Sequence, residues 1–335
     1  MSQAQAQADK PINVIQALNR ALFDAMAADS RVLVLGEDIG DAEEGGIVGV
    51  TRGLSTRFGE MRVRTTPIAE QAIIGAAIGA AINGYRPVAE IMLMNFVAVA
   101  MDMICNHAAK LRFMSGGQTQ VPLVIRTMTG AGFGTAGQHS DYLEAWFAHT
   151  PGLKVVAPAT PADAYGLLLS CIDDPDPCLF IENMPTYWVN GPPPKQDERV
   201  PLGKARISRE GTDATVVAYS RTAVEALAAA EQLAKEGISV EVIDLRTVVP
   251  WDRQAVLSSA AKTRHVLVAH EAVKSYGVGA EIAAVIQQEL WGQLRAPVGR
   301  VGGPSCAVPF SKPLETAFLT GAAQIGDGVR KMLES

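Results

Sequence analysis

The sequence has few cysteines, no cluster of basic residues and no apolar run long enough to cross a bilayer. The four cysteines are Cys105, Cys171, Cys178 and Cys306. Because no two of them form a CxxC pair, neither a disulfide framework nor a zinc site is expected. The longest apolar runs, 72–82 and 91–101, fall short of the roughly 20 residues that span a membrane. The net charge of −6 and the lack of a Lys/Arg run argue against nucleic acid as a partner.

The first ten residues are polar and rich in Gln and Ala. They lack the apolar core of a signal peptide, so we expect a disordered tail over residues 1–12. Together with the scattered free cysteines, this predicts a cytoplasmic protein that has no membrane segment.

The 335 residues, 48% of them hydrophobic, are enough for two domains with sizeable cores. Short apolar segments alternate with segments of helical spacing, which predicts parallel sheets covered on both faces. The expected strands are 32–35, 87–91, 122–126, 154–157, 179–182, 214–219, 240–245, 266–270 and 298–301. The expected helices are 13–28, 67–82, 96–114, 141–149, 161–173, 222–235 and 278–290.

A polar, proline-rich stretch at 183–202 interrupts this alternation. It predicts a linker over 191–205, between α/β domains at 13–190 and 206–335. We therefore expect two domains, each a three-layer α/β/α sandwich.

A glycine-rich segment, Gly132-x-Gly134-x-x-Gly137, matches the dinucleotide-binding fingerprint. That fingerprint also needs a helix opening on the glycines and an acidic residue ending the next strand, and the strand at 154–157 has none. We favour a flexible loop that presents His139, a residue type used in acid–base catalysis. A nicotinamide-dependent oxidoreductase remains an alternative that rests on this loop alone.

The segment Thr65-Thr66-Pro67-Ile68-Ala69-Glu70 precedes an apolar helix. With Thr66 as its N-cap and Pro67 at the first position, Glu70 is the fourth helical residue, one position too late for a capping box. The apolar helix that follows predicts a buried Glu70, and a buried carboxyl group can keep its proton. A solvated glutamate in a first helical turn is the alternative.

This segment resembles the Asp-Thr-Pro-Ile-x-Glu signature of the β subunits of thiamine-dependent 2-oxo acid dehydrogenases, with Thr65 where the family usually has Asp. The resemblance covers nearly the whole chain, from about Val14 to Leu333, and depends on the order and spacing of several motifs. These are Gly36-Glu37-Asp38, Arg86–Glu90, Asn95-Phe96, Asn106–Lys110, Ser115–Gly117, Pro151–Val156 and Asp244–Thr247.

The resemblance implies a pyrimidine-binding transketolase-like domain followed by a C-terminal transketolase-type domain. Glu70 then contacts the thiamine pyrimidine and promotes formation of the ylid, while Ile68 and Phe96 contact the cofactor. His139, in a His-Ser pair, lines the active site and steers protons during reductive acylation of a lipoyl group. For Phe96 an ordinary core position, and for His139 simple loop exposure, are the alternatives.

The resemblance also implies an α2β2 tetramer that binds thiamine diphosphate, with magnesium held mainly by the α subunit. Gly326-Asp327-Gly328 is similar to the start of a magnesium–diphosphate motif, but the downstream Asn is missing, so we expect this chain to lack the diphosphate half. A structural potassium ion is implied at backbone carbonyls. The matching residues are Leu123, Cys171, Ile172, Asp174 and Asp176.

The implied reaction is cleavage of a 2-oxo acid or acetoin, with transfer of the acyl group to lipoamide on an acyltransferase partner. The run Arg126–Phe133 with Gln138–Ser140 resembles the acetoin branch, and pyruvate and branched-chain 2-oxo acids remain open. Two alternatives are a split transketolase-like subunit that transfers a ketol group, and a non-catalytic assembly subunit.

Overall fold

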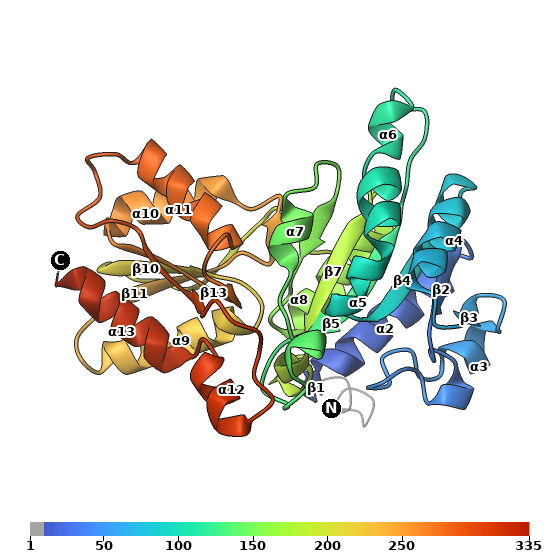
Figure 1. The fold of residues 1–335 in the computed structure, drawn as a ribbon, viewed down its shortest axis with the longest axis horizontal. Helices are drawn as coiled ribbons and strands as arrows, with labels where there is room; N and C mark the ends of the chain where they lie inside the picture. The colour runs from blue at the N-terminus through green and yellow to red at the C-terminus, as the bar shows by residue number, and fades with distance from the viewer. Residues whose placement is uncertain (1–9, 335) are drawn as a thin grey trace, which may run out of the picture. The chain divides into compact units, whose positions relative to one another are not determined.

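The computed structural model of the chain describes residues 10–334. The chain divides into two compact units, one running to Thr129 and including Trp146–Leu202, the other formed by Gly130–Ala145 and the chain from Gly203 onward. The expected disordered tail lies mostly outside the described residues, but Ile12 is part of a strand. Figure 1 follows the chain from blue to red.

The first unit contains a parallel sheet with the strand order β6-β7-β5-β4-β2-β3. A separate antiparallel pair joins β1 to β8. The strands are β1 (Ile12–Asn13), β2 (Val32–Gly36), β3 (Val63–Thr65), β4 (Arg86–Leu93), β5 (Val124–Thr129), β6 (Lys154–Val156), β7 (Cys178–Asn183) and β8 (Asn190–Gly191). Strands β5 and β7 are buried along their whole length, as expected for a sheet covered on both faces.

Helices flank this sheet, and α2 packs against α8 (Figure 1). The helices are α2 (Val14–Ala28), α3 (Leu54–Phe58), α4 (Glu70–Ile82), α5 (Met94–Val97), α6 (Leu111–Met114) and α8 (Pro161–Asp173), with α7 (Glu144–Ala148) across the division between the units. The shorter turns are η1 (Asp41–Glu43), η2 (Ala98–Ala100), the π-helix η3 (Met103–Ala108), η4 (Gly137–His139) and η5 (Met184–Trp188). The core lies between the sheet and the α2–α8 pair, where Leu18, Leu22, Tyr165 and Leu168 are fully buried.

Cap residues account for the two helices that were predicted most accurately. Asn13 and Gln16 form a capping box at the start of α2, with bonds of 2.9 and 3.0 Å. Thr160 caps α8, and Pro161 occupies the first turn. These side chains occupy backbone N–H groups that would otherwise lack partners, so the helix starts are set locally.

Three helix predictions need correction. The expected helix at 67–82 begins only at Glu70, because the Thr66 N–H donates to the Gly36 carbonyl at 2.9 Å and keeps that residue extended. The expected helix at 96–114 is instead a succession of short α, 3-10 and π segments. The expected helix at 141–149 shortens to Glu144–Ala148.

The second unit contains a sheet of order β14-β13-β10-β11-β9, parallel except for β9. Its strands are β9 (Arg206–Arg209), β10 (Ala214–Ala218), β11 (Val240–Asp244), β13 (Val266–Val273) and β14 (Gly299–Gly303), and β12 is Thr247–Val249. Its helices are α9 (Arg221–Ala234), α10 (Arg253–Thr263), α11 (Val278–Glu289), α12 (Lys312–Phe318) and α13 (Ala322–Leu333). The sequence did not predict β9, β12, α10, α12 or α13. Among residues 10–334, no helix has the length and apolar character needed to span a membrane.

Candidate active site

The carboxyl ends of β2, β3 and β4 meet at one edge of the first unit's sheet, because the three strands are parallel and adjacent. The chain goes from β2 outward to β3 and then returns to β4 on the other side of β2. Such a switch in strand order leaves a crevice at the carboxyl edge, where open α/β sheets bind ligands. Residues that directly follow these strands are therefore candidates for binding or catalysis.

Glu70 is the first residue of α4, and four residues separate it from the end of β3. Its helix has Ala69 as N-cap, without a side-chain cap. The Thr66 hydroxyl donates to the Pro67 carbonyl at 3.1 Å and so does not cap the helix as predicted. Glu70 is half-buried, less enclosed than the apolar helix behind it suggested.

Glu37 directly follows β2 and lies close enough to Glu70 for the charge of Glu70 to affect the pKa of Glu37. Burial, together with the charges of Asp38 and Glu70, raises the pKa of Glu37. A neighbouring negative charge raises the pKa of a carboxyl group because it disfavours the ionised form. The Gly36-Glu37-Asp38 motif predicted no chemical role for Glu37; the position of Glu37 immediately after a buried strand was the available signal.

Apolar side chains lie at the same edge. Ile68 is 74% exposed, which is high for an isoleucine beside a buried helix and leaves a surface for another molecule to cover. Phe96 is in α5, directly after β4, and is half-buried against the main core. The structure thus brings Glu70, Ile68 and Phe96 to neighbouring strand ends, and their contact with a cofactor stays a prediction.

His139 lies just after the glycine loop that follows β5, and both the loop and His139 group with the second unit. The glycines do not open a helix; the 3-10 turn η4 ends at His139, and α7 starts only at Glu144. The dinucleotide fingerprint therefore lacks the helix it requires. His139 is half-buried, and the neighbouring Ser140 hydroxyl lies 2.6 Å from the Thr135 hydroxyl.

Comparison with known proteins matches two family models: the pyrimidine binding domain of transketolase over residues 10–187 and the C-terminal domain of transketolase over residues 203–325. The β subunit of acetoin:2,6-dichlorophenolindophenol oxidoreductase from Cupriavidus necator is 43% identical, with 97% of this chain and 98% of the relative covered. The β subunit of 2-oxoisovalerate dehydrogenase from Bacillus subtilis is 42% identical, with 96% and 99% covered. The chain belongs to this family of dehydrogenase β subunits.

Membership in this family implies use of thiamine diphosphate. The mitochondrial β subunit of the pyruvate dehydrogenase E1 component from Drosophila melanogaster is 43% identical over 98% of the chain, so overall identity does not separate acetoin, branched-chain and pyruvate relatives. A solved chain of a split-gene transketolase superimposes with a TM-score of 0.79 at 23% identity, covering 97% of this chain and 99% of the other. That likeness concerns the fold alone.

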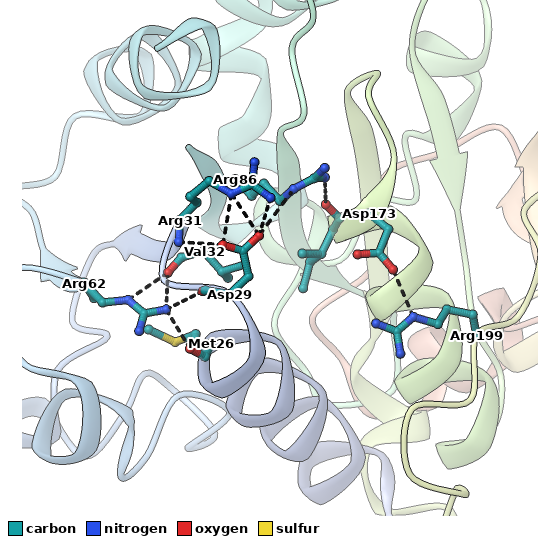
Figure 2. A network of polar contacts seen from close by, with 9 residues as sticks. Met26, Asp29, Arg31, Val32, Arg62, Arg86, Asp173 and Arg199 are labelled. Carbon is teal, nitrogen blue, oxygen red and sulfur yellow. Dashed lines mark hydrogen bonds and ion pairs between the residues drawn. The ribbon is translucent and has the colours of Figure 1, made fainter. Parts of the chain in front are cut away.

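The five residues matched to a potassium site gather near the end of α8, but most of their groups already have partners. The predicted residues are Leu123, Cys171, Ile172, Asp174 and Asp176. The carbonyls of the first two accept from backbone N–H groups at 2.9 and 3.3 Å. The Ile172 carbonyl accepts from Arg86 Nη1 at 2.6 Å. Arg86 also lies beside Asp29 (Figure 2). Lys154 and Arg112 pair with the two aspartates at 2.5 and 2.7 Å. Backbone N–H groups thus bind two of the five residues and cationic side chains bind the other three, and a potassium ion stays a prediction.

A buried ionic cluster, not predicted from the sequence as a unit, lies across β4, β5 and β7. Arg126 donates to both carboxylate oxygens of Glu182 at 2.6 and 2.8 Å and to Glu90 at 2.6 Å. Burial, and then the charge of Glu182, raises the pKa of Glu90 against the opposing effect of Arg126. A cavity of about 10 Å³ beside the cluster has room for roughly one water molecule. Two carboxyl groups therefore share one guanidinium.

Proposed function

We propose that the chain is the β subunit of an α2β2 enzyme that cleaves a 2-oxo acid or acetoin with thiamine diphosphate and passes the acyl group to lipoamide. The observation that carries the proposal is Glu70, placed at the carboxyl edge of the sheet beside a second carboxyl group, in a chain of this family. The cofactor, when bound, supplies the carbon nucleophile and electron sink for the bond cleavage.

Glu70 has the role of hydrogen-bonding a ring nitrogen of the cofactor's pyrimidine. Glu37 lies next to this carboxyl group, and burial together with the charges of Asp38 and Glu70 raises its pKa, which suits a site where a proton must be exchanged repeatedly. Ile68 and Phe96 offer apolar surface for the ring. Apolar side chains that pack against a bound ring exclude water and so strengthen the hydrogen bond of the nearby carboxyl group.

His139 serves the second stage, in which the acyl group moves to the lipoyl sulfur and protons must be delivered. A half-buried imidazole in a loop suits proton transfer near neutral pH. This assignment depends on the family resemblance and on the position of the ring in an ordered loop. Glu70 and His139 thus act in successive stages, which allows their variants to be distinguished by assay.

The exposed side of helix α4 is evidence that a partner chain binds to the first unit. Its exposed positions include Ala72, Ala76 and Ile82, so the helix presents apolar residues on its uncovered side as well as toward the core. A side chain added at Gly79 meets nothing within 4 Å, and one added at Gly75 meets only Met103. Small residues with this open space allow close approach of another helix, and we assign the surface to subunit assembly.

We further propose that the α subunit holds the diphosphate and most of the magnesium coordination. In this chain, Gly326-Asp327-Gly328 lies inside helix α13, so its glycines cannot form a phosphate-binding loop. No group of three or more His, Cys, Asp or Glu side chains arranged for a metal ion occurs among residues 10–334. The lipoyl acyltransferase is the proposed second partner.

The test is to co-express the chain with an α-type partner and measure dye reduction with thiamine diphosphate and magnesium. Acetoin, pyruvate and branched-chain 2-oxo acids are supplied in parallel, and ketol transfer is assayed beside them. Glu70→Ala should lose about a hundredfold or more in kcat, the range expected for an acid–base group. Glu60→Ala removes an exposed carboxyl group from the same unit and is the matched control.

Full activity of an assembled Glu70→Ala enzyme would contradict the proposal. Ketol transfer without dye reduction would instead support the split transketolase alternative. Calorimetry on the chain alone provides a second check, since a chain without the diphosphate half should bind thiamine diphosphate weakly compared with the assembled tetramer.

A further inference from the structure

The glycine loop, residues 130–137, has a backbone conformation that its own residues do not stabilise. The φ angles of Gly130, Gly132 and Gly134 are +116°, +127° and +68°, and that of Ala136 is +60°. Glycine loses more conformational freedom on ordering than other residues, and alanine is strained at positive φ. An ordered loop of this composition therefore needs fixed partners outside itself.

Two buried carboxylates of the second unit supply those partners. Glu271, near the end of β13, accepts a hydrogen bond from the Ala131 N–H at 2.8 Å. Glu315, in α12, accepts one from the Gly132 N–H at 2.7 Å and further bonds from the Gly134 N–H at 3.1 Å to each of its oxygens. The two glutamates are 4% and 3% exposed.

Glu315 differs from Glu271 in having no cationic partner in the described part of the chain. Glu271 lies 3.7 Å from Arg221, whereas the Glu315 carboxylate accepts its hydrogen bonds from the Gly132 and Gly134 N–H groups. A buried carboxylate is costly unless its charge is stabilised by hydrogen bonds. Here the loop N–H groups provide that stabilisation, and in return they receive charge-assisted bonds that are stronger than neutral ones.

The anchored stretch leads directly to His139. Val308 and Phe318 pack with Ala131 in a small buried cluster, which adds an apolar contact to the polar ones. After Gly134 only four residues intervene before His139, and its N–H donates to the Ala136 carbonyl at 3.2 Å. A shift of the loop at Gly134 is therefore transmitted to the imidazole over a short, hydrogen-bonded turn.

We propose that Glu315 is a positioning residue that holds the glycine loop in the form in which His139 serves acyl transfer. The inference rests on the proposed function for the role of His139, but the anchoring itself does not. Loss of the carboxylate should release the Gly132 and Gly134 N–H groups, let the loop sample other conformations and displace the imidazole. Displacement by about 1 Å can lower a rate on the order of a hundredfold.

The first experiment measures the loop directly, by hydrogen exchange in the chain co-expressed with its α-type partner. In Glu315→Ala, peptides that cover residues 130–137 should exchange faster than in the wild type. Glu281→Gln removes an exposed carboxyl group from the same unit, and Thr316→Ala removes a hydroxyl within α12 that bonds only to that helix; both should exchange like the wild type. Unchanged exchange in Glu315→Ala would overturn the anchor, whatever the enzyme's activity.

The second experiment separates the two stages of the reaction. Glu315→Ala should lose lipoyl-dependent acyl transfer by about tenfold or more while dye reduction changes by less than about threefold, because only the first depends on the position of His139. If Glu315 acts through His139, the double variant Glu315→Ala/His139→Ala should be no slower than His139→Ala alone. Equal loss in both assays, or additive losses in the double variant, would refute a positioning role.

Glu315→Gln covers the case in which the alanine variant fails to assemble. The amide oxygen can still accept from Gly132, but the amide nitrogen then faces the Gly134 N–H, so one contact becomes unfavourable. Intermediate exchange and an intermediate loss of acyl transfer are expected. Wild-type exchange together with wild-type acyl transfer in this variant would count against the proposal.

Discussion

Replacement of Glu144 by glutamine should stabilise the protein at alkaline pH and leave it nearly unchanged at acidic pH. Glu144 is fully buried at the start of α7, and its Oε1 accepts a hydrogen bond from the Tyr219 hydroxyl at 2.6 Å. Its Oε2 has no partner among the described residues. Burial raises the pKa of Glu144 from 4.5 to about 7, although the Tyr219 bond opposes the rise.

The sign of the pH dependence follows from this shift. Between pH 4.5 and about 7 the folded chain keeps a proton on Glu144 that the unfolded chain has released, so the free energy of unfolding falls as pH rises. The gap between the two pKa values corresponds to on the order of 3 kcal/mol. Glutamine mimics the protonated carboxyl group and still accepts from the Tyr219 hydroxyl, so Glu144→Gln should avoid this loss.

Urea unfolding at fixed protein concentration, from pH 5 to pH 8, measures the effect. At pH 8 the Glu144→Gln protein should be more stable than the wild type by about 3 kcal/mol, whereas at pH 5 the two should agree closely. Glu231→Gln, at an exposed site of the same unit, should keep the wild-type dependence on pH. Parallel wild-type and Glu144→Gln curves between pH 5 and pH 7 would show that Glu144 does not titrate as reasoned.

Two further predictions concern the buried ionic cluster and two glycines with positive φ. Arg126→Met should destabilise the protein by about 3–5 kcal/mol, because it leaves two buried carboxyl groups without their cation; Glu90→Gln keeps one charge pair and should cost less, as urea unfolding at pH 7 will show. Gly152 has a φ of +94°, and an added Cβ would lie 2.0 Å from the Ala109 carbonyl oxygen, so Gly152→Ala should prevent stable folding. At Gly237, with a φ of +82° and open space, the same change should lower stability by only about 1–2 kcal/mol; equal melting temperatures for the two variants would contradict this.

The helices and strands that sequence reasoning located best are those with local signals. The run of apolar residues in β7 and the Thr160-Pro161 start of α8 depend on residues close in the chain. By contrast, α10 is less apolar, and β9 is a short antiparallel edge strand whose Ile207 is exposed. For such elements packing against the rest of the unit decides the conformation, and a single sequence carries little sign of it.

Glu70 and His139 were found through motifs, but their surroundings depend on contacts between distant residues. Glu37 and Glu70 are neighbours because β2 and β3 pair in register, with Gly36 opposite Thr65. The Glu315 bonds join residues about 180 positions apart. Nothing in the Ser311–Phe318 segment distinguishes this glutamate from one on an ordinary helix surface, so only the fold reveals its use.

These contacts let the part of the second unit from Gly203 onward, where no catalytic residue was predicted, fix the segment that carries His139. Three buried glutamates act on residues 130–145: Glu271 and Glu315 bind loop N–H groups, and Glu144 joins the segment to Tyr219. In each case a carboxyl group is buried away from water. Burial of such a group costs free energy unless its hydrogen-bond partner is held in position. The segment therefore gains its fixed shape from the part of the second unit that begins at Gly203. Substitutions in that part should affect the imidazole of His139 before they affect the carboxyl group of Glu70.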